Sequence, residues 1–331
     1  MTNLKYLYFF TLLLLLCDNA IADSPPTEGS QLPKVVIRQE WFPFSGYAGE
    51  VAAAKTYAHE SGIDLKIQPG AADVDPIKLV LVKQADFGVV GADLLITAIA
   101  KGAPLVAIGM VNDRSPTCFL VKEDSGINGP EDFIGKKVGI LAGTNTERIY
   151  AVMMRRTKVD RKRIREVTVP FELQTFLLGR YDVRPAFIYD EPVTLDSKAF
   201  KYRIINPENY GVNFVGTVYF TRKQFLKEKP EIVARLVKTL IRGWQYALTN
   251  PEDAIRDLVK NYPDLNYDRE LRSLQAGNSY FKDANGKPLA GSRDRWENTI
   301  KGLEEIGELK PGKVTVDQVW DNSFVRSVYK D

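Results

Sequence analysis

The sequence is poor in the residues that many enzymes and metal sites depend on. It contains two cysteines and one histidine in 331 residues. Zinc sites built from Cys and His, and most Ser-His-Asp or Cys-His catalytic arrangements, therefore lack their parts. The single histidine, His59, stands near the end of an alanine-rich helical segment, where a surface position is expected. These absences favour a protein that has no catalytic residues of these kinds and no metal site.

The chain also lacks a strong charge of either sign. Its formal net charge is +3, and its hydrophobic content of 44% with 26% charged residues is typical of a globular protein. The basic run at residues 155–166 alternates with apolar positions, which predicts a solvated helix face rather than a nucleic-acid stripe. No nucleic-acid partner is expected.

The one long apolar run lies at the N-terminus. Residues 6–16 are apolar or threonine, and Ala-Ile-Ala at 20–22 gives a small-x-small cleavage pattern. We expect a signal peptide over residues 1–22, cleaved after Ala22, and an exported, soluble protein. Lipidation of Cys17 is the alternative, disfavoured because Leu16 is not small. Removal of Cys17 leaves Cys118 alone in an apolar, strand-like run, where a buried thiol without a disulfide is expected.

Strand-like and helical runs alternate through the first two thirds of the chain, which indicates an α/β protein with parallel sheets covered by helices. The expected strands are 34–39, 64–68, 85–90, 105–111, 118–122, 137–142, 165–170, 186–190, 202–206 and 216–221. The expected helices between them are 48–60, 75–84, 92–101, 145–157 and 172–179. Helices 223–249, 251–261, 268–280, 293–307 and 315–329 follow.

Ten strands are many for one sheet, so we expect two lobes with a ligand site between them. Seams rich in Gly, Pro and acidic residues near 122–133 and near 218–225 divide the chain. After a linker at 23–33, lobe I comprises 34–122 and 222–331, including the C-terminal helices, and lobe II comprises 123–221.

A family resemblance adds to this interpretation. The stretches "GEVAAAK" (49–55), "KQADFGVVGADLLITAIAKGAPLVAIG" (83–109), "LLGRYDVRPAFIYDEP" (177–192) and "KEKPEIVARLVKTLIRGWQYALTNPEDAI" (227–255) occur in a familiar order. Together they resemble the solute-binding proteins of ABC importers in the sulfonate, nitrate and thiamine-pyrimidine-precursor family. The resemblance covers roughly residues 34–280. It implies a type II-like periplasmic-binding-protein clamshell, a periplasmic monomer that delivers a small molecule to an inner-membrane permease and its ATPase.

The resemblance places an aromatic wall of the ligand pocket after the first strand, at Trp41 and Phe42. Tyr47 is expected to line the pocket or to cap the first helix. Asp93 opens a helix, where its carboxylate contacts the ligand or favours the helix dipole. Each of these residues has a structural alternative, because loop aromatics also fill cores.

Two further groups are candidates in the second lobe. Thr144, Asn145 and Thr146 open a helix, so that free N–H groups and hydroxyls converge in an anion-binding geometry or form an ordinary N-cap. Tyr189 is a possible wall residue. In the pyrimidine-binding members that this chain resembles, an acidic residue at about the position of Glu191 receives an exocyclic amine; the alternative is a salt bridge to a hinge Arg or Lys.

These residues leave several functions open. The aromatics with Glu191 favour a flat heteroaromatic ligand with an amine, such as a thiamine pyrimidine precursor, without a cofactor. A sulfonate, nitrate or riboflavin-like ligand is the alternative, and a sensory binding lobe is another. The resemblance also includes fungal thiamine-pyrimidine synthases, but Ala92 and Ile96 stand where their cofactor-binding lysine and their histidine would align. The iron-binding cysteines have no counterpart in 211–221.

Overall fold

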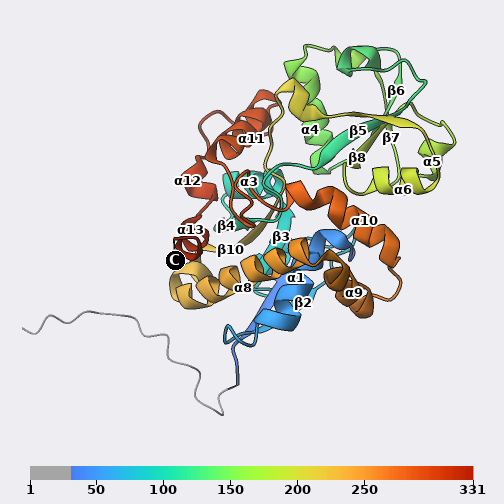
Figure 1. Cartoon of the computed structure of the whole chain (residues 1–331). Helices are drawn as coiled ribbons and strands as arrows, with labels where there is room; N and C mark the ends of the chain where they lie inside the picture. The colour runs from blue at the N-terminus through green and yellow to red at the C-terminus, as the bar shows by residue number, and fades with distance from the viewer. Residues whose placement is uncertain (1–30, 331) are drawn as a thin grey trace, which may run out of the picture. The chain divides into compact units, whose positions relative to one another are not determined.

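A computed structural model describes residues 31–330 (Figure 1). The expected leader, Cys17 and most of the linker lie outside the described residues. Ten strands form two five-stranded sheets, ordered β2-β1-β3-β10-β4 and β7-β6-β8-β5-β9. The strands are β1(Lys34–Arg38), β2(Asp64–Gln68), β3(Phe87–Gly91), β4(Leu105–Met110), β5(Thr117–Lys122), β6(Lys137–Ile140), β7(Arg165–Thr168), β8(Val183–Phe187), β9(Tyr202–Ile205) and β10(Thr217–Arg222).

The helices follow the sequence pattern closely. Short turns of helix, η1(Ser45–Tyr47), η2(Ala53–Tyr57) and η6(Asn278–Tyr280), accompany the α-helices. The α-helices are α1(Ala48–Ala52), α2(Pro76–Leu81), α3(Ala92–Ala100), α4(Asn145–Arg156), α5(Gln174–Leu177), α6(Glu191–Ser197), α7(Lys223–Glu228), α8(Pro230–Thr249), α9(Pro251–Asn261), α10(Tyr267–Gly277), α11(Arg293–Glu305), α12(Val316–Val319) and α13(Ser323–Val328). The start of α2 is set by nearby residues. Asp75 caps the helix by accepting a hydrogen bond from the Lys78 N–H, and Pro76 occupies the first turn.

The expected parallel pairs are present, but each sheet also contains antiparallel pairs. β1 pairs in parallel with β2 and β3, and β6 does so with β7 and β8. β10, however, runs antiparallel to β3 and β4, and β5 runs antiparallel to β8 and β9. Both are the first strands that the chain forms after it passes from the other sheet, so they do not follow the helical crossovers that make neighbouring strands parallel.

The chain passes between the sheets at different places from those expected. The passages are residues 111–116, between β4 and β5, and residues 206–216, between β9 and β10. Strand 117–122 therefore belongs to the second sheet and strand 217–222 to the first, which corrects the assignments of 34–122 to lobe I and 123–221 to lobe II. The Gly- and Pro-rich seam at 122–133 is a loop that connects β5 and β6, both in the second sheet.

Each sheet is covered on both faces by apolar side chains. On one face of the first sheet, α8 and α9 contribute Leu236, Trp244 and Ile255 to a core that also contains Ile37 and Val89. On the other face, residues from α3 and the C-terminal helices, among them Leu95 and Trp296, form a second core. The C-terminal helices thus pack on the first sheet, as expected. Two smaller cores flank the second sheet, and one of them contains the fully buried Cys118.

One strand differs from the sequence prediction. β8 spans Val183–Phe187 rather than residues 186–190, although it contains Arg184 and Pro185. The proline is accommodated because β8 pairs with β6 only at Val183. The chain turns after Phe187 into α6, which the sequence did not predict. Tyr189 and Glu191 consequently lie in a turn and at a helix start.

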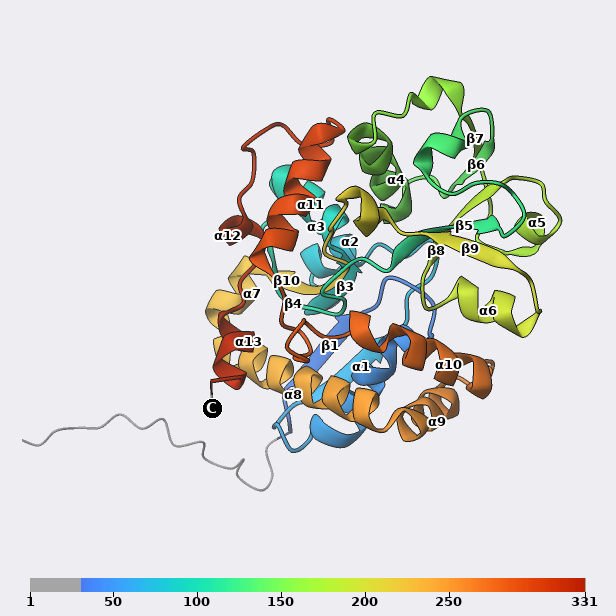
Figure 2. The ribbon, with the colours of Figure 1, turned by 45° about the horizontal axis from the view of Figure 1, so that its top comes forward.

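Helix α10 lies where the two sheets' helices meet (Figure 2). It packs against α9 and η1 on the side of the first sheet and against α6 on the side of the second. In the part of the chain that the structure describes, no helix combines the length and apolar character needed to cross a membrane.

Candidate functional site

The candidate site lies beyond the carboxyl ends of the parallel strands, where α/β sheets hold their ligands. Gln39 and the loop that begins at Glu40 follow β1, and α3 begins directly after β3. In the second sheet, α4 follows β6 after a short loop, and α6 follows β8. The side chains discussed below all come from these strand ends or from elements packed on them.

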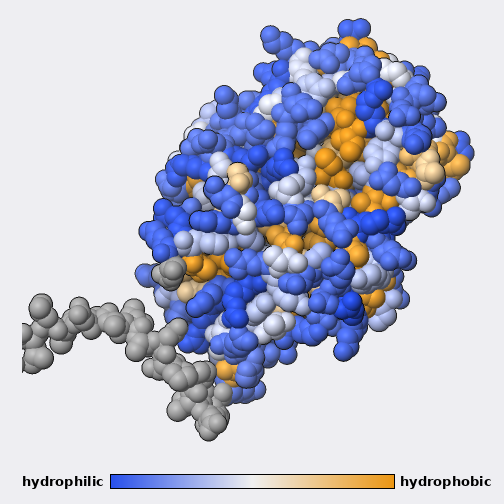
Figure 3. All heavy atoms as spheres, viewed as in Figure 1, coloured by the Kyte–Doolittle hydropathy of each residue, from blue (hydrophilic) through white to orange (hydrophobic). Residues whose placement is uncertain are grey.

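Aromatic rings from the two lobes meet at this place. The ring of Trp41, after β1, lies 4.7 Å from the ring of Phe171, after β7, with the planes inclined by 56°. Phe42 packs edge-on against Trp41 at 5.4 Å. Phe42 and Phe171 are about half exposed, at 50% and 47%. Hydrophobic residues also gather on the visible face around β5 and towards α10 (Figure 3). Phe171 was missed in the sequence, where its only signal is an aromatic directly after a strand.

Tyr47 is buried beneath this aromatic loop. Its hydroxyl accepts a hydrogen bond of 3.2 Å from the Trp41 N–H, and its ring meets Phe44 edge-on at 5.0 Å. Burial, followed by the charges of Glu40 and Glu50, raises the pKa of Tyr47 well above its usual range. The residue therefore stays protonated and fixes the backbone that carries Trp41.

Two carboxylates converge at the ends of β1 and β3. Glu40 Oε2 accepts a hydrogen bond of 3.2 Å from the Gly91 N–H. A methyl group at Gly91 would lie 2.7 Å from Asp93 Oδ1. Burial, and then the charge of Asp93, raises the pKa of Glu40 to about 8. Burial also raises the pKa of Asp93, although Arg148 opposes this shift. Glu40 was missed in the sequence although it directly precedes Trp41.

Arg148 connects Asp93 to the second lobe. It projects from α4 with Nη1 3.5 Å from Asp93 Oδ2 and Nε 3.4 Å from Glu308 Oε2. The same helix start brings Asn145 opposite Gly91, since a methyl group there would lie 3.8 Å from Asn145 Cβ. Asp93 and Asn145, expected separately, are thus brought together.

The hydroxyls at the start of α4 are already engaged. Thr144 Oγ1 donates to the Leu141 carbonyl at 2.7 Å and lies 2.8 Å from Thr146 Oγ1. Glu147 Oε2 accepts a hydrogen bond of 2.7 Å from the Gly143 N–H. Thr144 occupies the N-cap position but forms no side-chain cap hydrogen bond. The hydroxyls of Thr144 and Thr146, which were expected to bind an anion, therefore form hydrogen bonds within the loop.

Tyr189 and Glu191 lie apart from the aromatic pair of Trp41 and Phe171, and each is held by other contacts. Tyr189 is buried against Phe281 at 5.2 Å and Tyr280 at 6.0 Å. Glu191 Oε2 accepts from the Phe187 N–H at 2.8 Å, and Oε1 lies 3.5 Å from Arg184 Nη2. This ion pair is the alternative foreseen for Glu191, with a partner in β8 rather than in a hinge. Burial raises the pKa of Glu191, and the Arg184 charge opposes that shift.

Arg184 links Glu191 to the aromatic pair. Its side chain is fully buried, and its guanidinium donates to the carbonyls of Pro170, Phe171 and Glu172. These contacts fix the loop that carries Phe171. Glu191 thus acts on the site through Arg184, as a positioning residue.

A second contact between the lobes involves α10. The Arg269 guanidinium pairs with Asp190, and its Nη1 lies 2.5 Å from Glu270 Oε1. The other oxygen of Glu270 accepts from the Ser45 N–H at 2.7 Å. One helix therefore holds both the turn before α6 and the loop that follows Trp41.

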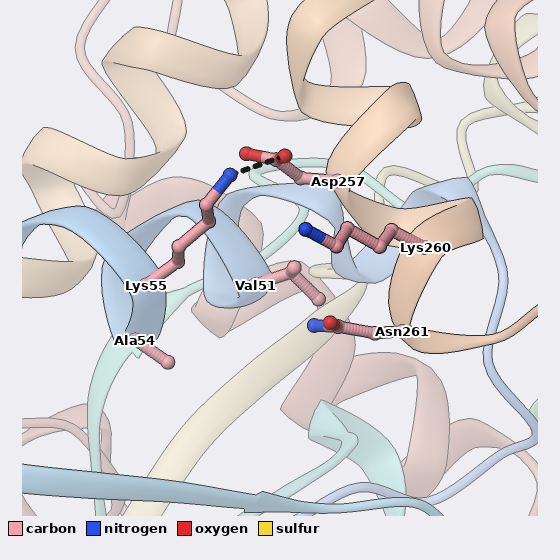
Figure 4. Close-up of a pocket in the computed structure, with 6 residues that line it drawn as sticks. All are labelled: Val51, Ala54, Lys55, Asp257, Lys260 and Asn261. Carbon is pink, nitrogen blue, oxygen red and sulfur yellow. Dashed lines mark hydrogen bonds and ion pairs between the residues drawn. The ribbon is translucent and has the colours of Figure 1, made fainter.

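Two pockets lie away from this site. One, of about 320 Å³, lies between α1, η2 and α9, where Lys55 Nζ is 2.5 Å from Asp257 Oδ1 (Figure 4). Another, of about 470 Å³, lies beside β9 and α6 and is lined by residues that include Asp196 and Tyr202. Neither contains a predicted site residue. Within residues 31–330, no group of three or more His, Cys, Asp or Glu could hold a metal ion.

Sequence relatives include both binding proteins and enzymes. The family described as NMT1/THI5 like matches residues 48–254. The formylaminopyrimidine-binding protein of Halalkalibacterium halodurans is 25% identical over 303 residues, which cover 88% of this chain and 91% of that protein. A 4-amino-5-hydroxymethyl-2-methylpyrimidine phosphate synthase of Legionella pneumophila is 26% identical over 219 residues. These residues cover 65% of this chain and 69% of the synthase.

Solved structures share the fold. The periplasmic aliphatic sulphonate binding protein SsuA of Escherichia coli superposes with a TM-score of 0.70 at 18% identity, covering 88% of this chain and 94% of that one. The periplasmic nitrate-binding protein NrtA of Synechocystis PCC 6803 gives a TM-score of 0.69 at 11% identity, covering 91% and 89%. The expected two-lobed α/β fold of periplasmic binding proteins is confirmed.

Proposed function

Since the chain belongs to the NMT1/THI5-like family, we propose that it is the solute-binding protein of an ABC importer and captures a small, flat heteroaromatic ligand between its lobes. The observation that carries this proposal is the contact of Trp41 with Phe171, 4.7 Å apart and contributed by different sheets. Such rings can hold a planar ligand by stacking when the lobes open and close. The likeness to a formylaminopyrimidine-binding protein supports the same ligand class.

We place Trp41, Phe42 and Phe171 at the aromatic wall, with Asp93 and Asn145 beside it. Tyr47 supports the wall through its hydrogen bond with the Trp41 N–H, and Tyr189 packs behind it against Phe281 and Tyr280. The preferred ligand is a heteroaromatic with an amine, such as a thiamine pyrimidine precursor. A sulfonate or nitrate fits less well, because the Asp93 carboxylate would repel an anion and the hydroxyls of Thr144 and Thr146 are engaged. A riboflavin-like ring would share the aromatic wall but not need the amine.

We further propose that the protein acts outside the cytoplasm, in the periplasm, after cleavage at Ala22, with lipid attachment at Cys17 as the alternative. A membrane permease with its ATPase is the proposed partner, and the protein works as a monomer. A sensory role would use the same binding event. Coupling of ligand binding to uptake in cells that carry or lack the gene separates transport from sensing.

An enzymatic role is the rival from another class, since some relatives are named as synthases. The resemblance aligned Ala92 and Ile96 with the cofactor-binding lysine and the histidine of those enzymes. Both side chains belong to α3, are apolar and are fully buried in the core on that face of the first sheet. The residues present therefore do not fit that cofactor, and we assign no reaction to the site.

Calorimetric titration of the purified protein tests the proposal. The probes are 4-amino-2-methylpyrimidine, riboflavin and ethanesulfonate. We expect the aminopyrimidine to bind more tightly than ethanesulfonate, and Trp41→Ala to weaken its binding. Leu178→Ala, at an exposed apolar residue outside the site, is the matched control and should change nothing. Preferential binding of ethanesulfonate would refute the ligand class. Formation of a pyrimidine product from pyridoxal phosphate and iron under air would refute the binding-protein role.

A further inference from the structure

Two acidic side chains share one small region at the site. Glu40 follows β1, Asp93 begins α3, and both approach Gly91, which ends β3. Gly91 has no side chain, and a Cβ atom there would lie within 2.7 Å of Asp93 Oδ1. The Asp93 carboxylate therefore occupies space that a side chain at position 91 would fill, while Glu40 contacts the Gly91 backbone N–H. Glu40 directly precedes Trp41, so this acidic region adjoins the aromatic wall.

Polar atoms in this region lack hydrogen-bond partners. Asp93 is only 3% exposed, and its Oδ2 forms no hydrogen bond with any described residue. Arg148 Nε is also buried without one. The guanidinium stands 3.5 Å from Asp93 Oδ2, which is an ion-pair distance but not a good hydrogen bond. Buried polar atoms are normally satisfied, so Asp93 Oδ2 points to a missing donor and Arg148 Nε to a missing acceptor.

The charges in this region do not balance. The Arg148 guanidinium forms ion pairs with Asp93 and Glu308, and it also donates to the carbonyls of Gly143 and Thr144 at 3.4 Å. Within the described part of the chain, Glu40 forms no ion pair; its one hydrogen bond comes from the Gly91 N–H. Asp75 adds a further negative charge near Glu40. Uncompensated buried carboxylates are costly unless a cation or a hydrogen-bond donor meets them.

We propose that Glu40 and Asp93 form the subsite that receives the amino group or the protonated ring nitrogen of the ligand. The ligand is then an amine-bearing or cationic heterocycle whose ring lies against Trp41. This inference rests on the proposed function, since it requires a ligand between the lobes. It transfers to Glu40 and Asp93 the role that the resemblance implied for Glu191, whose oxygens already accept from Phe187 and pair with Arg184.

The test compares two heterocycles that differ only in the amine. The probes are 4-amino-2-methylpyrimidine and 2-methylpyrimidine, titrated into the wild type, Glu40→Gln, Asp93→Asn, Glu191→Gln and Trp41→Ala. A lost charge-assisted hydrogen bond weakens binding by about 10- to 100-fold. We expect this loss for Glu40→Gln and Asp93→Asn with the aminopyrimidine alone. Glu191→Gln, which acts through the Phe171 loop, should change the affinity for both probes by the same factor.

The outcomes separate the two proposals. The subsite is refuted if Glu40→Gln and Asp93→Asn bind the aminopyrimidine as tightly as the wild type. The proposed function still stands in that case if Trp41→Ala weakens the binding of both probes. If the wild type binds neither heterocycle, both are refuted. Glu40→Gln is isosteric and keeps an oxygen that can accept from the Gly91 N–H, so it should fold even if Asp93→Asn does not. Circular dichroism of each variant confirms that the folded state is compared.

Discussion

The ring of Trp41 lies 4.7 Å from the ring of Phe171, and each ring is anchored from its own lobe. The Tyr47 hydroxyl accepts from the Trp41 N–H, and Arg184 donates to the Phe171 carbonyl. Neither aromatic therefore depends on its partner for its position. An aromatic wall that is fixed on both sides is ready to accept a flat ring without first ordering its loops, which lowers the entropic cost of binding.

Trp41→Ala should weaken binding of 4-amino-2-methylpyrimidine by about 1–3 kcal/mol, the cost of losing a buried aromatic contact. The probe should also change the emission of the wild type, because Trp41 is only partly buried whereas Trp244, Trp296 and Trp320 lie in the core. Fluorescence titration measures both effects. An emission change of full size in Trp41→Ala would show that another tryptophan reports the ligand.

Arg184→Met should weaken ligand binding and destabilise the fold. It removes the donors that hold the Phe171 loop and leaves the Glu191 carboxylate buried without its cation. Breaking such a buried pair costs about 3–5 kcal/mol. The double variant Arg184→Met with Glu191→Gln should recover part of the stability but not the affinity, as measured by urea unfolding and calorimetry. Recovery of both would mean that the loop does not depend on Arg184.

Glu50 gives the first lobe a stability that depends on pH. It is fully buried, accepts from Gln39 at 2.7 Å and Tyr219 at 3.0 Å, and forms no ion pair with any residue of the described range 31–330. Burial raises its pKa from 4.5 to about 7. Because the folded state holds the proton more tightly, the stabilisation is complete below about pH 4.5 and is lost as the pH rises through 7.

At pH 9, Glu50→Gln should therefore have a larger free energy of unfolding than the wild type, by at most about 3 kcal/mol. The difference should vanish near pH 4. Glu60→Gln, at an exposed pair with Arg242, is the matched control and should show no such crossover. Urea unfolding at four pH values measures the effect. A constant difference at every pH would show that Glu50 remains ionised.

Gly243→Ala should destabilise the first lobe by about 1–3 kcal/mol, because the added Cβ overpacks a close helix contact. That atom would lie 2.3 Å from the Gly49 carbonyl oxygen and 2.6 Å from Ala53 Cβ. Lys238→Ala, at an exposed position of the same helix, is the control. Equal unfolding midpoints for the two variants would mean that α1 and α8 can separate without cost.

Local patterns in the sequence predicted the strands and helices well. The apolar run of a strand and the spacing of apolar residues along a helix can both be recognised within a short stretch of sequence. The ten strands and most helices lie within a few residues of their predicted positions. The start of β8 was predicted three residues too late because Arg184 and Pro185 are unusual in a strand, and the proline is accommodated because β8 pairs with β6 only at Val183. The passages between the sheets were misplaced because residues 111–116 carry a weaker loop signal than the Gly- and Pro-rich 122–133.

The site was less predictable, because its contacts join segments far apart in the chain. Trp41 and Phe42 were recognisable as aromatics on a loop after a strand. Phe171, which meets Trp41, is 130 positions away and became relevant only when the sheets were assembled. Glu40 was overlooked because a charge at a strand end is usually solvated, whereas here its carboxylate accepts from the Gly91 N–H, 51 positions away.

Native mass spectrometry of the protein purified from its own source tests directly whether the ligand is an amine-bearing heteroaromatic. We expect a non-covalent adduct whose mass and fragmentation identify a small heteroaromatic with an amine, and we expect it to be absent from Trp41→Ala prepared in the same way. An adduct that proves to be a sulfonate, a nitrate ion or another anion would show that the proposed ligand class is wrong.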